Sequence, residues 1–249
     1  MNSLSAIFNV IISPKQAFAA LKERPYILVI MVLTALITGV VTFAIMSHLD
    51  PVTVRTEIRE QIQEFKSKIE SQTGQSLTDE KIDEMVDKRA EGMSKWTVIS
   101  SFVAPVTSVI MYLILALIFF LLFKLLDTEL SYKQSFSLIL HCYIPHLIKA
   151  ILAVVIAMVK GSYGMMELQN LVASNPGALV DPKTQKVLHT LLTSLDLFNV
   201  WVVVLMILGF GIVSDKKPSR VAPWIIGLWI LWIVVKVGAT AVLGSVFGS

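Results

Sequence analysis

Charged residues are scarce in this sequence. They make up 16% of the 249 residues, while hydrophobic residues make up 55%. A soluble domain carries about 25% charged residues, so this composition excludes an ordinary soluble domain. The hydrophobic residues also stand in continuous runs. Since the strands of a membrane β-barrel alternate between apolar and polar residues, a β-barrel is excluded as well.

The sequence also lacks the motifs of common enzymes. It contains no His-Glu-x-x-His, no nucleotide-binding glycine loop and no Gly-x-Ser-x-Gly. No Asp or Glu falls within the long apolar segments, which excludes an intramembrane aspartyl site. The one cysteine, Cys142, cannot form an intramolecular disulfide. We therefore expect neither enzymatic activity nor a cofactor.

Long apolar segments dominate the rest of the chain. Five of them approach the roughly 20 residues that a helix needs to cross a bilayer. The fourth is short, but it can lengthen outward through Leu191 and Leu192. The sequence therefore predicts an all-α membrane helix bundle over residues 25–249, with five transmembrane helices at about 27–46, 103–123, 136–159, 197–213 and 224–246.

Residues 1–24 precede the first of these segments. Large apolar residues recur there at helical spacing, first between Leu4 and Ile12 and then at Phe18 and Leu21. Short amphipathic helices next to a transmembrane segment are typical of the membrane interface. We expect residues 1–24 to form two cytoplasmic interfacial helices; a flexible tail is the alternative.

A long polar segment, 48–97, separates the first two apolar segments. Its first half has a narrow apolar stripe that suits one partner helix. Gly74 can end that helix, and Thr78 can cap a second one. We expect an extracytoplasmic antiparallel helical hairpin that docks a partner, while 160–196 forms a second outer loop. The hairpin contacts would come from Ile58, Ile62, Phe65, Ile69, Ile82 and Met85.

Basic residues set the predicted orientation. The segment 48–97 has eight Lys/Arg and eleven Asp/Glu, a net charge of −3, which leaves +6 for the remainder. Lys and Arg are denser in the short segments on the side of the N-terminus, so that side is predicted to be cytoplasmic. Five spans then place the C-terminus outside. The basic loops indicate contact with anionic membrane lipids rather than with nucleic acid.

Polar residues interrupt the third apolar segment. Pro145 has no N–H, so the carbonyl of His141 loses its helical partner. On a continuous helix Cys142, His146 and Lys149 share one face. We expect this face to point into the bundle, because hydrocarbon offers no partner for exposed backbone. Cys142 and His146 could supply two metal ligands, but no third is visible, so a polar contact is preferred over a metal site.

Two lysines fall near the middle of predicted spans. Lys149 and Lys236 each lie ten residues from the outer end of their segment, about 15 Å deep. Charge at that depth is expensive and commonly functional. With no acid expected at this level, the pair would bind an anion together with His146, Cys142 and His141, or one lysine would be neutral. Alternatively, each lysine reaches the interface or donates to a carbonyl.

Several motifs together resemble one known family. They are Ser13-Pro14 followed by Phe18, the proline in the third span, Asn-Pro-Gly-Ala-Leu-Val in the loop 160–196, and Leu-Asp-Leu-Phe-x-x-Trp-x-x-x-Leu-x-x-x-Gly at 195–209. The last and most specific motif contains Asp196, Phe198, Trp201 and Gly209. The chain resembles the bacterial branch of the Yip (Rab/Ypt-interacting-protein-like) family.

This resemblance implies a five-span, non-enzymatic protein of the bacterial inner membrane with a cytoplasmic N-terminus. Eukaryotic members interact with Rab-type GTPases, but the N-terminal segment here has only about two dozen residues, which makes GTPase binding doubtful. Some bacterial members are encoded beside ABC-type exporters. The hairpin at 48–97 is not a general feature of the family.

Two functions follow from these observations. The first is a non-enzymatic accessory or scaffold protein that binds another membrane protein such as an ABC-type exporter. The second is a small transporter or a lipid- or anion-binding membrane protein that uses the lysine pair.

Overall fold

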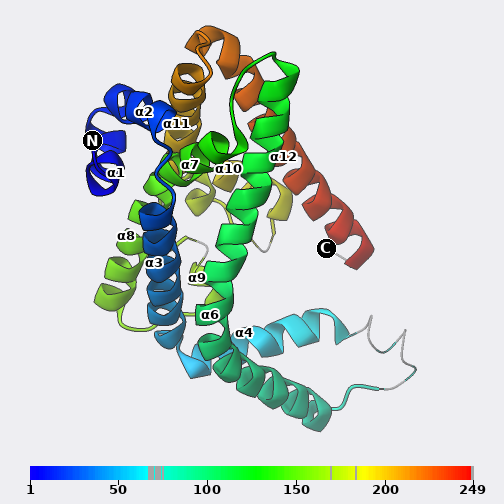
Figure 1. Cartoon of the computed structure of the whole chain (residues 1–249). Coiled ribbons are helices and arrows are strands. Elements are labelled where there is room, and N and C mark those ends of the chain that lie inside the picture. The colour runs from blue at the N-terminus through cyan, green and yellow to red at the C-terminus, as the bar shows by residue number, and fades with distance from the viewer. Residues whose placement is uncertain (67–69, 71–73, 75, 169, 183, 248–249) are drawn as a thin grey trace. The chain divides into compact units, whose positions relative to one another are not determined.

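The computed structural model describes residues 1–247 except 67–69, 71–73, 75, 169 and 183. The secondary structure of this part of the chain is helical. In addition, Leu49 and Tyr163 form an isolated β-bridge. The helices, shown in Figure 1, are α1 (Ser3–Ile12), α2 (Pro14–Glu23), α3 (Leu28–Ser47), α4 (Pro51–Glu64), α6 (Asp79–Leu125), α7 (Tyr132–Cys142), α8 (Ile144–Lys160), α9 (Met165–Leu168), the 3-10 helix η1 (Pro176–Leu179), α10 (Lys186–Ser194), α11 (Leu197–Val213) and α12 (Pro218–Phe247).

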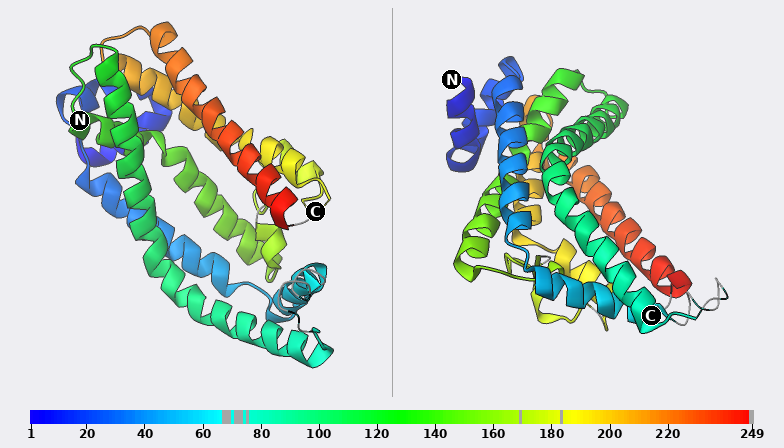
Figure 2. Two further views of the ribbon diagram at one scale, coloured as in Figure 1. Left: turned by 90° about the vertical axis from the view of Figure 1, so that its right-hand side faces the viewer. Right: turned by 90° about the horizontal axis from the view of Figure 1, so that it is seen from below.

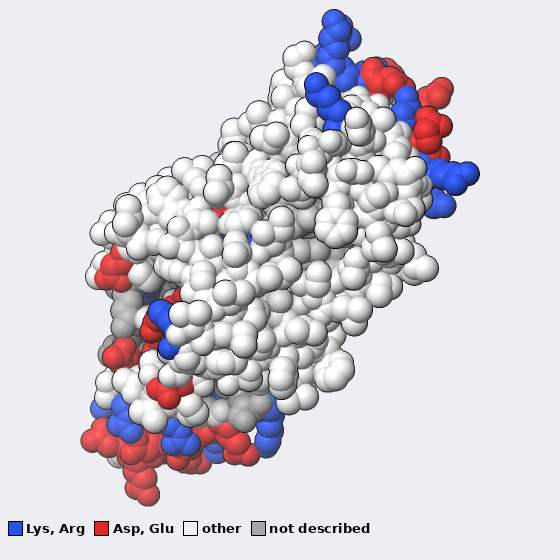
Figure 3. All heavy atoms as spheres, turned by 90° about the vertical axis from the view of Figure 1, so that its left-hand side faces the viewer, with Lys and Arg blue, Asp and Glu red and all other residues white. Residues whose placement is uncertain are grey.

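The helices agree with the predicted membrane-spanning segments. In the described residues, four stretches are long and apolar enough to cross a bilayer, and α10 with α11 forms a fifth if this bent pair is counted as one span. Figure 3 shows wide areas of the surface that carry no Lys, Arg, Asp or Glu. Such a surface suits contact with lipid. The four stretches are Leu28–Ser47, Lys95–Leu125, Tyr132–Lys160 and Pro218–Val242.

Contacts divide the chain into two compact units. The first contains residues 1–37, 106–150 and 173–249, and the second contains residues 38–105 and 151–172. Three helices, α3, α6 and α8, contribute residues to both units.

Stacked aromatic rings lie at the centre of the first unit. The ring of Phe210 on α11 lies 4.8 Å from that of Phe123 and 5.0 Å from that of Phe119, both on α6. Phe18 of α2 is also completely buried in this core. Aromatic rings at these separations add to the stabilisation that comes from their burial. The core thus joins α2, α6 and α11.

The N-terminal helices differ from each other in how they use their apolar residues. In α2, Phe18 and Leu21 are buried in the core of the first unit, so this stripe packs against the protein. That α2 lies at the membrane interface stays a prediction. Small side chains on the same face, such as Ala17, let α2 pack closely against the protein. In α1, by contrast, the large apolar residues Leu4 and Phe8 are exposed.

The third predicted span is interrupted as the proline suggested. Helix α7 ends at Cys142, Tyr143 leaves the helix, and α8 begins at Ile144 with Pro145 as its second residue. In a straight helix the proline ring would clash with the backbone carbonyl four residues earlier. Helix α7 is buried in the first unit from Ser135 to Cys142. The prediction that this part of the span lies inside the bundle is confirmed.

The fourth span is bent at its N-terminal end. Helices α10 and α11 meet at 43°, with Leu195 and Asp196 between them. The sequence suggests that the fourth span lengthens through Leu191 and Leu192. In the structure these residues belong to a separate helix, α10, and not to a straight extension of α11. A carboxylate at the bend, on Asp196, caps the first turn of α11 and so favours a new helix start there.

A helical hairpin occupies much of the second unit. Ile58 and Ile62 of α4 are buried with Leu77, Ile82 and Val86, and the return helix starts at Asp79 behind the cap at Thr78, as predicted. The return helix then continues without a break as α6, whose whole course can be followed in Figure 2.

The first helix of the hairpin is shorter than predicted. Helix α4 ends at Glu64, and Phe65 is its partly buried C-cap residue, so a single helix up to Gly74 is wrong. Gly74 itself has a φ of 65°, a conformation that glycine adopts without strain. Ile69, a predicted hairpin contact, lies outside the described residues, while Met85 packs against the hairpin core as expected.

A second segment holds the base of the hairpin. The carboxylate of Glu57 on α4 accepts hydrogen bonds from the backbone N–H groups of Met165 (2.8 Å) and Met166 (3.3 Å). Negative charge at a helix N-terminus is favourable, and these two residues begin α9. A side chain at Gly164 would put its Cβ 2.3 Å from Glu57, so only glycine fits beside this contact.

Candidate functional site: a polar cluster at the start of α11

A buried carboxylate is the centre of the main polar cluster. Asp196 precedes α11 and is 2% exposed. Its Oδ1 accepts a hydrogen bond of 2.9 Å from the backbone N–H of Phe198, which is an N-terminal helix cap. Its backbone neighbour Leu197 donates its N–H to the carbonyl of Ser174 at 3.0 Å. The loop around residue 174 and the start of α11 are thereby held together.

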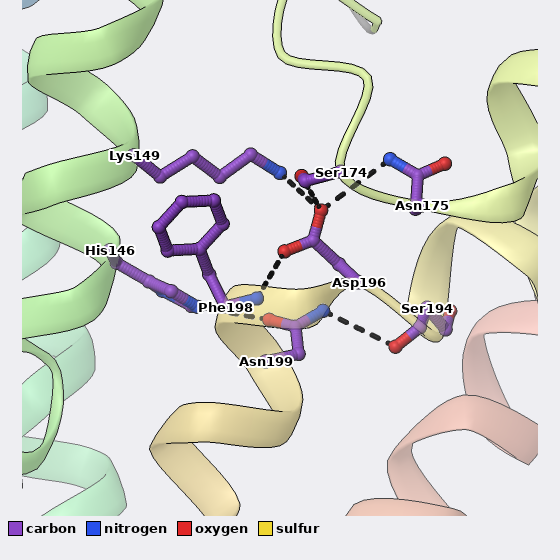
Figure 4. Close-up of polar contacts among 8 residues, drawn as sticks. All are labelled: His146, Lys149, Ser174, Asn175, Ser194, Asp196, Phe198 and Asn199. Carbon is purple, nitrogen blue, oxygen red and sulfur yellow. Dashed lines mark hydrogen bonds and ion pairs between the residues drawn. The ribbon is translucent and has the colours of Figure 1, made fainter.

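The other carboxylate oxygen of Asp196 has three donors, which Figure 4 shows. The ammonium of Lys149 lies 2.7 Å from Oδ2, the hydroxyl of Ser174 donates to it, and the amide of Asn175 donates at 3.5 Å. Lys149 comes from α8 and remains one-third exposed. Burial of a carboxylate is costly, and such additional hydrogen bonds help its partner ammonium to offset that cost.

A second contact lies one helical turn away on α8. Nε2 of His146 donates to the amide oxygen of Asn199 at 2.9 Å, and the amide nitrogen of Asn199 donates to the carbonyl of Ser194 at 3.3 Å. Ser194 is the last residue of α10 and Asn199 lies in the first turn of α11. His146 and Lys149 therefore tie α8 to both sides of the bend.

These contacts favour a structural role over a catalytic one. All hydrogen-bond donors that surround Asp196 already point at its two oxygens, so the carboxylate is poorly placed to take a proton from a substrate. In the described residues there is also no group of three His, Cys, Asp or Glu that could hold a metal ion. The cluster joins α8, the loop before η1, and α11.

The structure corrects the sequence-based expectation for Lys149. We expected no acid at its level, but Asp196 is its partner, so that expectation is wrong. The sequence offered no relation between these two residues, which lie 47 positions apart. Lys236 is half-buried on α12, where its backbone carbonyl accepts a hydrogen bond from Thr240. A shared site for Lys149 and Lys236 stays a prediction.

The remaining predicted residues lie apart from the cluster. Cys142 is fully buried in the core of the first unit. His141 is also fully buried, with its Nδ1 2.8 Å from the carbonyl of Ser137. Both precede the break at Tyr143, so their register with His146 is not that of a continuous helix.

Sequence reasoning missed the polar side chains that complete the cluster. Ser174 and Asn175 come from a loop more than twenty residues before the carboxylate that they contact. Asn199 follows Asp196 by three residues, a spacing that places both in the first turn of a helix. That spacing is the local feature of the sequence that could have indicated that Asn199 belongs to the cluster.

The family motif at 195–209 also packs α11 against its neighbours. Phe198 is buried and its ring stacks on that of Trp201, with 6.5 Å between the ring centres. Gly209 lies where α11 meets α2 and α7. A Cβ atom there would lie 3.0 Å from the ring of Phe18 and 3.2 Å from Leu138.

We expect the substitution Gly209→Leu to lower the free energy of unfolding by about 1–3 kcal/mol, because overpacked side chains force their neighbours to move. Thermal unfolding in detergent measures this loss. Gly227→Leu on α12 is the matched control, since a Cβ at Gly227 has no atom within 4 Å. Equal stability of the two variants would contradict the close packing of α2 on α11.

Comparison with known protein families identifies the family of this chain. The Yip1 domain family model matches residues 8–243. No curated protein and no solved structure matches the chain significantly.

Proposed function

The chain belongs to the Yip1 domain family and is a multi-pass membrane protein, and on this basis we propose that it is a non-enzymatic accessory or scaffold protein that binds another membrane protein. The proposed partner is an ABC-type exporter of the bacterial inner membrane. This partner is motivated by the resemblance to bacterial Yip proteins.

The hairpin of α4 and α6 is the observation that carries this proposal. It has its own apolar core, and ion pairs between Arg55 and Asp87 (2.7 Å) and between Arg59 and Asp83 join its helices. Exposed ion pairs contribute little to stability, so the core and the contact of Glu57 with α9 hold the hairpin. Helices that are already packed on each other lose less conformational freedom when a partner binds.

A groove on the hairpin is the surface that we propose for docking. It has a volume of about 430 Å³ and lies between α4 and the start of α6. Val52, which is 71% exposed, lines it together with the two arginines and aspartates of the ion pairs. In the proposed docking surface, Val52 would make the apolar contact and the charged side chains would form the polar rim.

Purification from native membranes tests this function. The full chain should co-purify with another membrane protein in a fixed ratio, and Val52→Arg should reduce the amount of that protein while the hairpin stays folded. Arg89→Ser is the matched control, because Arg89 is exposed and does not line the groove. Isolation of the chain without a partner, combined with transport by the chain alone in liposomes, would overturn the proposal.

We further propose that the hairpin is extracytoplasmic and that the N-terminus is cytoplasmic. A cysteine in place of the exposed Glu80 should react with an impermeant thiol reagent in intact cells whose outer membrane has been made permeable. A cysteine in place of the exposed Glu129, which follows α6, should react only after lysis. The native Cys142 is fully buried and gives a low background. The reverse labelling pattern would contradict this topology.

The second candidate is a lipid- or anion-binding protein that uses the lysines. The exposed third of the Lys149 side chain favours it, because an anion could still approach the ammonium. Asp196 already neutralises that ammonium, however, and this weakens the attraction for a second anion. Retention of a lipid phosphate that is lost in both Lys149→Met and Lys236→Met would favour this candidate over the scaffold.

A further inference from the structure

Helix α1 turns its bulkiest apolar side chains away from the protein. Leu4, Phe8 and Ile12 are 55%, 67% and 76% exposed, and their spacing of four residues places them on one face. The opposite face contributes Ala6 and Val10, which are completely buried. A helix at a water-facing surface has its larger apolar residues inside. Here the arrangement is reversed, so the outer face of α1 requires a covering.

This outer face belongs to a well-formed helix. Asn2 and Ser5 form a reciprocal capping box at the start of α1. The phenol of Tyr26, just before α3, donates a hydrogen bond to the carbonyl of Met1. The buried Ala6 and Val10 hold the middle of the helix. The exposed apolar residues are therefore held in place and are not part of a frayed end.

Contacts of α2 show where this helix lies along the membrane-spanning helices. The ammonium of Lys22 is 2.6 Å from the carboxylate of Asp215, in the loop that follows α11. The carbonyl of Lys22 accepts a hydrogen bond of 2.8 Å from the amide of Gln134, in the first turn of α7. Both partners stand at the ends of membrane-spanning helices. The N-terminal helices therefore lie at the level where these helices meet the membrane surface.

The chemistry of α1 indicates which part of the membrane covers it. The helix contains no Asp, Glu, Lys or Arg, and its polar residues are Ser3, Ser5 and Asn9. An uncharged helix gains nothing from anionic headgroups, but its bulky apolar residues gain from contact with acyl chains. The first turns of α3, which follow Tyr26, expose apolar residues in the same way at Leu28.

We propose that α1 lies in the surface of the bilayer, with Leu4, Phe8 and Ile12 inserted among the acyl chains of the adjacent monolayer. Apolar contact holds the helix there, and charge does not. Helix α2, whose apolar face is buried in the protein, packs against α1. The N-terminal segment is thus anchored to the membrane in addition to the membrane-spanning helices.

Fluorescence of the full chain in vesicles tests this proposal. Phe8→Cys and, separately, Ile12→Cys are labelled with an environment-sensitive fluorophore, and the exposed Lys15→Cys on α2 is the matched control. In phosphatidylcholine vesicles, nitroxide groups on the acyl chains should quench most of the emission at positions 8 and 12, and aqueous iodide should quench little. The probe at position 15 should show the opposite pattern.

Two further comparisons exclude other coverings. The result at position 8 should not change when the protein is diluted in lipid, and it should be the same with and without phosphatidylglycerol. Protection that disappears on dilution would show that a second copy of the chain covers α1. Protection that requires phosphatidylglycerol, or iodide quenching as strong as at position 15, would equally overturn the proposal.

Discussion

Replacement of Asp196 by alanine should lower the free energy of unfolding by about 3 kcal/mol, because it leaves the ammonium of Lys149 without its partner in a largely buried position. The same change removes the cap of α11, which adds to the loss. Reversible unfolding in bicelles measures the difference. Removal of one member of a buried pair is costly mainly because the other charge remains.

A second ion pair in the same unit is the matched control. Lys22 and Asp215 are 2.6 Å apart, but Asp215 is 77% exposed, so Asp215→Ala should cost at most about 1 kcal/mol. The combination Asp196→Asn with Lys149→Met should recover part of the stability that Asp196→Asn loses, because no unpaired charge remains. If Asp196→Ala costs no more than Asp215→Ala, the cluster does not hold α8 to α11.

Replacement of Ile62 by aspartate should unfold the hairpin while the membrane-spanning helices still insert. Ile62 is 3% exposed in the hairpin core, where it is packed among apolar side chains. Burial of an unpaired charge is among the most destabilising kinds of substitution. We therefore expect the free energy of unfolding of the hairpin to fall by about 3 kcal/mol or more. Rapid proteolysis within residues 48–97, with the chain still in the membrane fraction, is the expected result.

The same variant tests the docking role of the hairpin. Under the scaffold proposal, Ile62→Asp should also lose the co-purifying membrane protein. Phe65→Asp should have a smaller effect, because Phe65 is only partly buried at the end of α4. Unchanged recovery of the partner with an unfolded hairpin would place the docking surface elsewhere on the chain.

Local features of the sequence predicted the helices well. Long apolar runs reveal membrane-spanning helices because each helix satisfies its own backbone hydrogen bonds, whatever its neighbours are. Pro145 correctly marked the interruption between α7 and α8, and Thr78 correctly marked the start of the return helix of the hairpin. The end of α4 was misplaced, because the stripe of Ile58 and Ile62 continues in the sequence beyond Glu64, where the helix stops.

The contacts of the polar cluster required the tertiary structure. Lys149 and Asp196 are 47 residues apart, and no periodicity relates them. Counting residues along straight helices placed them at different depths in the membrane. Packing of α8 beside the start of α11 brings the two side chains together.

By itself, then, the sequence determined that this is an all-helical membrane protein, where its apolar helices lie and which family it belongs to. These properties depend on composition and on short-range pattern. Only the tertiary structure decided which charges are paired and which apolar faces are covered. Helices α1 and α2 carry similar stripes, yet α2 buries Phe18 while α1 exposes Phe8. That choice depends on the shapes of distant neighbours such as Gly209, against which Phe18 packs, because a side chain can be buried only where another part of the chain leaves space for it.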